Sequence, residues 1–276
     1  MKQVINIAID LETLSLESDA AIVSIAAVPF NPNVEVFNDY SVFQVIPEGA
    51  TEPLGEFYEV VNATSCALQG MHIDMETVKW WSCQKPEAKA ELLSRQPLNI
   101  GEAMNAFHNY FEGMKRAYDA DIVVWAQGAD FDFPKIRNAY NKCLCGVNRP
   151  WGYRDVRDAR SIVLDGLEMM YGREAKPYDR IPECPTFKEV LKHSALYDAR
   201  RTAWSVANVR NMICRSISEA HTSATTPKSS ERGTKWGARS SMPCTARSTS
   251  SFRACTSGNT SWYRTSASAT PNTTPL

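Results

Sequence analysis

The chain has 276 residues, a formal net charge of −1 and 43% hydrophobic residues. This length allows one large domain or two small ones. The nearly balanced charge argues against tight, sequence-independent binding of long duplex nucleic acid, although a local basic patch would be enough to recognise one strand end.

The eight cysteines are scattered and lack the paired CxxC spacing of structural zinc sites. A chain of this size does not need disulfides, and no signal peptide opens it. No apolar run approaches the roughly 20 residues that a membrane-spanning helix requires. We therefore expect a protein of the reducing cytoplasm with no membrane partner.

The C-terminal part differs in composition from the rest. Residues 216–276 include 26 Ser or Thr among 61 residues, with seven Lys or Arg and two Glu. Such a segment cannot bury enough apolar area to offset its ordering entropy. We expect residues 1–213 to form the domain and 214–276 to be a tail. One interpretation is a disordered basic tail that helps to hold nucleic acid; the other is a loss of the native reading frame near Arg215.

Two carboxylates follow an apolar strand pattern near the N-terminus. Residues 5–9 read Ile-Asn-Ile-Ala-Ile, and Asp10 and Glu12 come next. Residues i and i+2 of a strand point to the same face, so the two carboxylates would stand side by side. Like charges in a half-buried place repel each other and lose hydration, and a divalent cation offsets both effects. The alternative is a solvated pair in the loop after the strand.

The hydrophobic pattern predicts further elements in chain order. Two more strands complete an antiparallel meander, residues 47–75 look irregular, and a later strand and several helices follow. The expected strands are Ala20–Phe30, Val34–Ile46 and Asp121–Ala126. The expected helices are Glu76–Trp81, Pro86–Leu93, Gly101–Ala117, Phe133–Cys143, Arg154–Met170, Pro185–Lys192 and Asp198–Ile213.

Two local features have competing interpretations. Trp80 and Trp81 could stack nucleic-acid bases, but paired tryptophans in this context are more often core residues. Asp155 and Asp158 could be metal ligands, but alternating Arg and Asp residues on a helix more often form surface ion pairs.

Four features then stand in order along the chain: Asp10-x-Glu12, Phe131–Asp132, His193 and Asp198. This pattern resembles the DEDDh group of 3′→5′ exonucleases. The surrounding residues "AIDLETL", "TVKWWSCQKPEAKAEL", "WAQGADFDFPKIRNAY" and "HSALYDARRTAW" resemble its RNase T-like branch of phages and bacteria, which is often labelled exonuclease VIII-like or 3′ exoribonuclease. The resemblance covers residues 1 to about 213.

The resemblance implies an α/β, ribonuclease H-like fold, with a mixed sheet of antiparallel meander and parallel strands flanked by helices. It implies a two-metal site for Mg²⁺ or Mn²⁺, in which Asp10 bridges the ions, Glu12 and Asp198 complete the nucleophile-side ion and Asp132 holds the other. By the same resemblance, His193 is the general base, a role that suits an imidazole because its unperturbed pKa lies near 6.5.

Asp130 competes with Asp132 for the role of third acid. The family's acid follows an aromatic residue, which selects Asp132 after Phe131 and leaves Asp130 as a helix cap. The segment departs from the family at Gln127, where the family usually has Asn before the glycine.

The expected activity is hydrolysis of phosphodiester bonds at single-stranded 3′ ends of RNA or DNA, with release of nucleoside 5′-monophosphates. We expect substrate contacts from Leu11, Thr13, Leu14 and Phe131. The alternative is a catalytically impaired nucleic-acid-binding module of the same fold, left by a degenerate prophage. Related nucleases are often homodimers, and the sequence leaves that state open. A spatial expectation follows: the first strand should lie beside the end of the Ile122–Trp125 strand and the start of the last helix.

Overall fold

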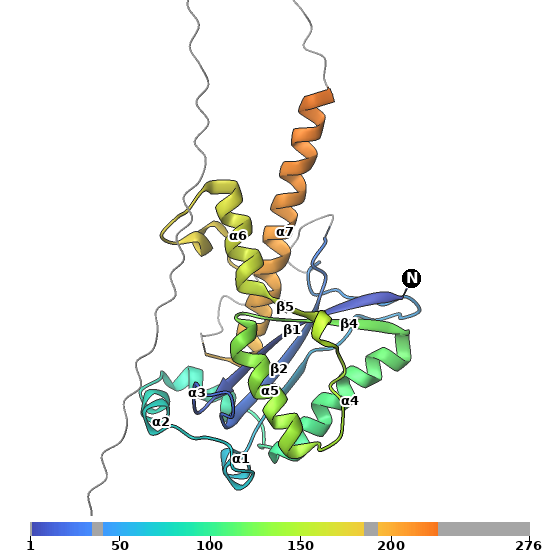
Figure 1. Cartoon of the computed structure of the whole chain (residues 1–276). Coiled ribbons are helices and arrows are strands. Elements are labelled where there is room, and N and C mark those ends of the chain that lie inside the picture. The colour runs from blue at the N-terminus through green and yellow to red at the C-terminus, as the bar shows by residue number, and fades with distance from the viewer. Residues whose placement is uncertain (1, 35–40, 185–192, 226–276) are drawn as a thin grey trace, which may run out of the picture. The chain divides into compact units, whose positions relative to one another are not determined.

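The computed structural model describes residues 2–34, 41–184 and 193–225. Its centre is a mixed five-stranded sheet in the order β3-β2-β1-β4-β5 (Figure 1). The strands are β1 (Gln3–Thr13), β2 (Ile22–Phe30), β3 (Phe57–Val60), β4 (Ala120–Ala126) and β5 (Val156–Asp158). The first three strands pair antiparallel, whereas β4 and β5 run parallel to β1. This order and these directions confirm the expected ribonuclease H-like sheet.

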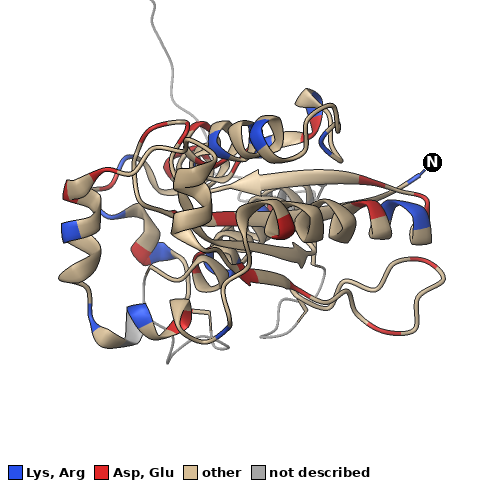
Figure 2. Ribbon diagram, turned by 90° about the horizontal axis from the view of Figure 1, so that it is seen from below, with Lys and Arg blue, Asp and Glu red and all other residues tan. Residues whose placement is uncertain are grey.

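Helices cover both faces of the sheet. They are α1 (Ala63–Leu68), α2 (Met75–Ser82), α3 (Pro86–Leu92), α4 (Ile100–Tyr118), α5 (Ala129–Cys143), α6 (Ala159–Tyr171) and α7 (Ala195–Thr225), with 3₁₀ turns η1 (Tyr153–Asp155) and η2 (Pro177–Arg180). One core cluster joins the sheet to α1, α4 and α5, and a second joins it to α6 and α7. Lys and Arg positions are interspersed with Asp and Glu positions along the ribbon, as the nearly balanced charge leads one to expect (Figure 2).

The alternation of β1 distributes its side chains between the two clusters. Ile5, Ile7, Ile9 and Leu11 belong to the cluster of α4 and α5, whereas Ala8 belongs to the cluster of α6 and α7. Side chains two residues apart share a face, so the even-numbered residues beyond Ala8 face α7.

The structure corrects the end of the strand predicted over residues 34–46. Residues 35–40 lie outside the described part, and residues 41–46 form a turn followed by irregular chain. The third strand is β3, within the segment expected to be irregular, and the same segment contains α1. Three of the four residues of β3 are buried, and a strand of four residues is too short to show the alternating pattern on which the prediction relied.

The helix predicted over Arg154–Met170 is also partly wrong. Its first residues form η1 and β5, and α6 begins only at Ala159. Asp158 ends the strand and caps the helix, because its Oδ1 accepts a hydrogen bond of 2.7 Å from the Ser161 N–H. A three-residue edge strand is too short to show a period of two.

The remaining helix predictions agree with the structure within a few residues, except at three places. The last helix, expected over Asp198–Ile213, is α7 and extends from Ala195 to Thr225, so its final twelve residues lie in the segment expected to be a tail. The helix expected over Phe133–Cys143 begins four residues earlier, with Gly128 as its N-cap, so Asp130 lies inside the first turn and is not the cap. The helix expected over Pro185–Lys192 lies outside the described residues. No helix within the described ranges is long and apolar enough to span a membrane.

The expected meeting of three chain segments is confirmed. β1 pairs with β4 in parallel from Gln3–Ala120 to Ala8–Trp125. The start of α7 lies beside β1, because one oxygen of Asp198 comes within 4.8 Å of an oxygen of Asp10, and it packs on β2 through Ala195 and Ala199, which belong to the same cluster as Ala26. Small side chains at these two positions allow the helix to approach the sheet closely.

Helices α6 and α7 also approach each other closely, at Gly166. A Cβ atom on Gly166 would lie 2.5 Å from Val209 Cγ1 and 3.1 Å from Ile213 Cδ1. Valine in a helix has one strongly preferred rotamer, so Val209 cannot easily move aside. Glycine at position 166 therefore allows α6 and α7 to approach each other this closely.

We expect Gly166→Ala to destabilise the protein by a net ~1 kcal/mol, because overpacking typically costs 1–3 kcal/mol and the gain in helix propensity recovers only part of it. Gly113→Ala in α4 is the matched control, since its Cβ would meet nothing within 4 Å. Chemical denaturation measures both; a stabilised Gly166→Ala variant would contradict the packing argument.

Candidate active site

Asp10 and Glu12 stand where β1 extends beyond its parallel neighbour. Pairing with β4 ends at Ala8, while pairing with β2 continues through Asp10–Ala26 and Glu12–Ser24. The backbone register shifts between Glu12 and Thr13, where the strand ends. Both carboxylates are half-buried. They lie at the carboxyl end of a parallel pair, which is where open α/β sheets bind ligands.

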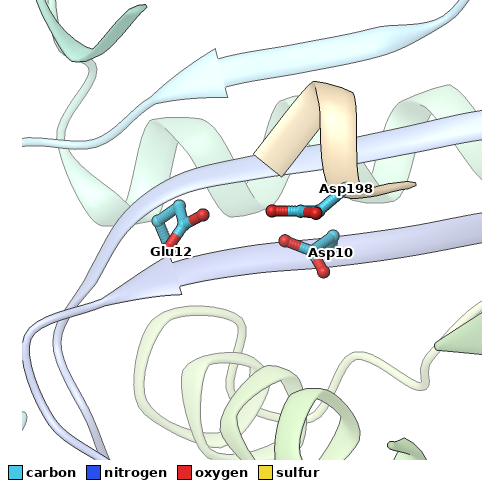
Figure 3. Close-up of side chains that lie close together, drawn as sticks. All are labelled: Asp10, Glu12 and Asp198. Carbon is cyan, nitrogen blue, oxygen red and sulfur yellow. The ribbon is translucent and has the colours of Figure 1, made fainter. Parts of the chain in front are cut away.

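The third carboxylate comes from α7. Asp198 lies in the first turn of that helix, and its oxygens face those of Asp10 and Glu12 (Figure 3). One oxygen from each of the three residues lies within 4.8 Å of the others. Arg201 on the next turn of the helix reaches Asp198, with 3.2 Å between Nε and Oδ1, and both partners are partly exposed. One arginine therefore faces three carboxylates.

Asp132 adds a fourth carboxylate from α5. It is only 3% exposed, whereas Asp130 is on the surface. Its Oδ1 atom is buried and has no hydrogen-bond partner among the described residues. Gly128 makes the turn from β4 into α5 with φ +116°, which favours glycine, and a Cβ there would lie 3.1 Å from Arg160 Nη2.

Burial raises the pKa values of Asp10, Glu12 and Asp132, and repulsion from neighbouring carboxylates adds to the effect for Asp10 and Glu12. Burial, followed by the charges of Asp132, Asp198 and Glu12, raises the pKa of Asp10 well above its ordinary value. Burial and the neighbouring carboxylates raise the pKa of Glu12 to about 8. Burial raises the pKa of Asp132 to about 7, although Lys135 and the Leu11 N–H favour its charged form. The ionised forms of Asp10 and Glu12 are thus destabilised by the neighbouring carboxylates.

This donor set fits divalent cations. Hard oxygen ligands that face one another at the distances found here are the coordination that Mg²⁺ and Mn²⁺ prefer. Asp132 Oδ1 is a buried acceptor without a protein donor, as expected of an atom that serves a bound ion. Asp10, Glu12 and Asp198 could hold one ion, with Asp132 beside them.

His193 lies next to this cluster, immediately before α7. Its backbone N–H donates to Asp198 Oδ2 over 3.2 Å, and its φ is 71°. Non-glycine residues rarely adopt this left-handed conformation, and those that do often occupy functional sites. The imidazole packs against Trp80 of α2, with 4.9 Å between the ring centroids and 87° between the planes.

A cavity of about 450 Å³ opens beside Glu12. Its apolar walls come from Leu11, Leu16, Trp80, Trp81 and Phe131, and Thr13 also lines it. Of the residues expected to contact substrate, Leu11, Thr13 and Phe131 therefore line the same cavity. Leu14 packs against the core cluster instead, and Leu16 takes its place in the cavity with 76% exposure.

Trp80 and Trp81 differ in burial and in their contacts. Trp81 is buried, and its indole N–H donates to the Thr13 carbonyl over 3.0 Å, so the core interpretation is correct for this residue. Trp80 is 43% exposed and lines the cavity.

Asp155 and Asp158 are not members of the group formed by Asp10, Glu12 and Asp198. Asp155 accepts a hydrogen bond from the Gly152 N–H at 2.9 Å, and Asp158 accepts one from Ala129 N–H at 2.8 Å in addition to capping α6. Both carboxylates thus accept hydrogen bonds from backbone N–H groups, whereas the sequence predicted surface ion pairs.

Two buried charges near the site have no signal in the sequence. Lys135 is 1% exposed; its Nζ donates to the carbonyls of Leu16 and Phe131, each over 3.1 Å. Glu91 of α3 lies close enough to raise the pKa of Glu12, and burial raises its own pKa. Both residues occur among charged neighbours in helical segments, where the pattern is that of a solvated surface.

The sequence is similar to that of a phage nuclease. The chain is 24% identical over 131 residues to an exodeoxyribonuclease of Enterobacteria phage T4, an alignment that covers 46% of this chain and 51% of the relative. Thus the chain spans about half the length of that relative.

Two solved structures of E. coli exonuclease I also resemble the fold. The zinc-bound complex with single-stranded DNA matches with 14% identity and a TM-score of 0.46, over 80% of this chain and 43% of that one. A complex with an oligonucleotide matches with 15% identity and a TM-score of 0.44, over 79% of this chain and 43% of that one.

The model of one protein family matches residues 5–210, which include most of β1, all four carboxylates and His193. That family is described as the 3′-5′ exoribonuclease Rv2179c-like domain. The chain belongs to this family of exoribonuclease-like nuclease domains.

Proposed function

We propose that this protein is a metal-dependent 3′→5′ exonuclease that acts on single-stranded ends and releases nucleoside 5′-monophosphates. The observation that carries the proposal is the carboxylate cluster at the end of β1, where oxygens of Asp10, Glu12 and Asp198 lie within 4.8 Å of one another. Membership of the exoribonuclease-like family supports the same reaction.

The four carboxylates would hold two Mg²⁺ or Mn²⁺ ions, with Asp10 between them. Bound ions supply an activated water and neutralise charge on the phosphate and the departing 3′-oxygen. The protein contributes the fixed placement of its acids: two on a strand whose pairing holds the backbone, and one in the first turn of each of two helices. Such rigid elements keep reacting groups in register.

His193 would take the proton from the attacking water. An imidazole is a side chain suited to accept a proton at neutral pH. The hydrogen bond from its backbone N–H to Asp198 places the residue beside the carboxylates. The side chain belongs to the segment that precedes α7, so it can approach the scissile phosphate from outside the sheet.

The cavity beside Glu12 would receive the 3′-terminal base. Leu11, Phe131 and Trp80 offer apolar surface in its lining. Bases stack on aromatic side chains with little dependence on sequence, as a nuclease that removes successive nucleotides requires. The cavity lies beside Glu12, so a base within it would bring its phosphate towards the acids.

Oligonucleotide degradation tests the proposal directly. Ribo- and deoxyribo-oligonucleotides labelled at the 3′ end should both be offered, because the matched family is described as exoribonuclease and the phage relative as exodeoxyribonuclease. We expect early loss of the 3′ label with Mg²⁺ and none with EDTA. Retention of the label on both substrates by folded protein would contradict the proposal and favour a binding module.

Asp132→Ala should abolish cleavage, and Asp130→Ala should leave it unchanged. Metal stabilisation of developing charge contributes several kcal/mol, so the loss of one ligand is expected to lower kcat by at least ~100-fold. Asp130 is the matched control, because it lies two residues away in the same helix on the exposed side. Initial rates on the labelled oligonucleotide decide; the opposite ranking of the two variants would contradict this assignment of the third acid.

His193→Gln should lower kcat by about 10²–10⁴-fold, the usual contribution of a general base, while Mg²⁺ binding is retained. His108→Gln is a control on α4, where His108 packs against Tyr140. Single-turnover rates and Mg²⁺ titration calorimetry measure the two properties separately. A variant that loses metal binding as well, or keeps its full rate, would rule out the proposed role.

Stabilisation by Mg²⁺ should grow as the pH rises from about 6 to about 8. The pKa of Glu12 is raised from 4.5 to about 8 in the folded protein, so the unfolded chain loses this proton first and the metal-free protein becomes less stable as pH increases through that interval. A cation binds the deprotonated carboxylates and removes this penalty. The measurement is the Mg²⁺-dependent shift in Tm at each pH.

Asp10→Asn is the control for this experiment, because it removes one charge from the centre of the cluster. The variant should show a small Mg²⁺ shift that does not grow with pH. A wild-type shift that shrinks towards pH 8 would contradict the electrostatic account.

A further inference from the structure

Trp80 lies between the cavity and His193. It lines the cavity together with Leu11 and Phe131, and its ring meets the His193 imidazole edge to face, 4.9 Å between centroids. The side chain is 43% exposed. One indole therefore has surface on the space proposed for the base and surface on the proposed general base.

The backbone under Trp80 is anchored to the end of β1. The neighbouring Trp81 is buried and donates its indole N–H to the Thr13 carbonyl over 3.0 Å. At the other end of α2, the Asp74 N–H donates to the Leu14 carbonyl over 2.8 Å, and Asp74 caps the helix. The position of the Trp80 Cα is thus fixed relative to Glu12, while its ring projects from the helix.

His193 has a complementary set of contacts. Its backbone is tied to Asp198, but within the described ranges the ring contact of its imidazole is with Trp80. The left-handed φ of 71° needs support from such surrounding contacts to persist. The placement of the imidazole therefore depends on the placement of the indole.

We propose that Trp80 is a positioning residue that couples the entry of the 3′-terminal base into the cavity to the placement of His193. This inference rests on the proposed exonuclease function. A base that stacks on the indole restricts the ring to one orientation, and the ring edge then restricts the imidazole. Because an error of 1 Å in placement can cost about 100-fold in rate, this restriction would act on kcat and not only on binding.

Kinetics with and without the terminal base test the coupling. The two substrates are an oligodeoxynucleotide with an intact 3′ end and the same strand with an abasic 3′-terminal nucleotide. We expect wild-type kcat to be about tenfold lower on the abasic end, the size expected for the loss of one aromatic pair. Trp80→Ala should have the same low kcat on both substrates, close to the wild-type value on the abasic end. Trp80→Phe should restore most of the wild-type difference in kcat between the intact and abasic ends.

Met75→Ala is the control from the same helix, since Met75 is 62% exposed and does not line the cavity. It should keep the wild-type difference between the substrates. The proposal is overturned if Trp80→Ala raises only KM, or if it keeps the full kcat difference between the intact and abasic ends.

Proton NMR on the intact chain gives a second test, which does not depend on turnover. The protein has four histidines, so the imidazole Hε1 signals can be resolved, and the His193→Gln variant assigns the one of interest. Adenosine 5′-monophosphate with Mg²⁺ should shift the His193 signal more than ribose 5-phosphate with Mg²⁺ does. The difference should vanish in Trp80→Ala; equal shifts in the wild type would overturn the proposal.

The outcomes separate this inference from the function on which it rests. If the wild type degrades neither labelled oligonucleotide, the exonuclease proposal fails. If it degrades them and Trp80→Ala behaves as the wild type does, only the coupling fails. Should Trp80→Ala prove unfolded by circular dichroism, the wild-type spectra and Trp80→Phe kinetics decide.

Discussion

Repulsion among four carboxylates is the constraint on which this structure depends. Asp10, Glu12 and Asp198 face one another across less than 5 Å, and the buried Asp132 adds its charge to theirs. Bringing like charges together in a half-buried place costs free energy that packing alone does not recover. The surrounding elements must therefore hold these side chains in place against their own repulsion, and a cation that binds them releases that energy. Burial and neighbouring carboxylates raise the pKa of Glu12, and burial raises the pKa of Asp132, so ionising either group in the folded protein is unfavourable.

The sheet explains how the arrangement is held. β1 is the central strand, with antiparallel and parallel neighbours on its two sides. Because β4 ends before Asp10, the strand end leaves room for α5 on one side, while the small residues of α7 bring Asp198 close on the other. The loop that follows β1 is tied to α2 by Trp81 and to α5 by the buried Lys135. These hydrogen bonds involve residues next to or within the lining of the cavity. They therefore hold the lining in a fixed position relative to the acids.

Sequence reasoning recovered the parts of this site that have a local pattern. The strand alternation places Asp10 and Glu12 on one face, and the order of acids and histidine indicated the family. The choice of Asp132 over Asp130 agrees with their opposite burial. What the sequence could not show depends on contacts between distant segments: Glu91 and Lys135 look like surface residues until the fold buries them, and Leu16 rather than Leu14 reaches the cavity because the loop turns Leu14 into the core. The short strands β3 and β5 were missed because three or four residues carry too little periodicity.

The most direct test of the central claim is the location of bound ions. Crystals of the protein soaked with Mn²⁺ and adenosine 5′-monophosphate would reveal each ion by anomalous scattering. We predict Mn²⁺ peaks at the end of β1, bound by oxygens of Asp10, Glu12, Asp132 and Asp198, with the base in the cavity lined by Trp80 and Phe131. A map without Mn²⁺ at these four carboxylates, in protein that degrades the labelled oligonucleotides, would contradict the account.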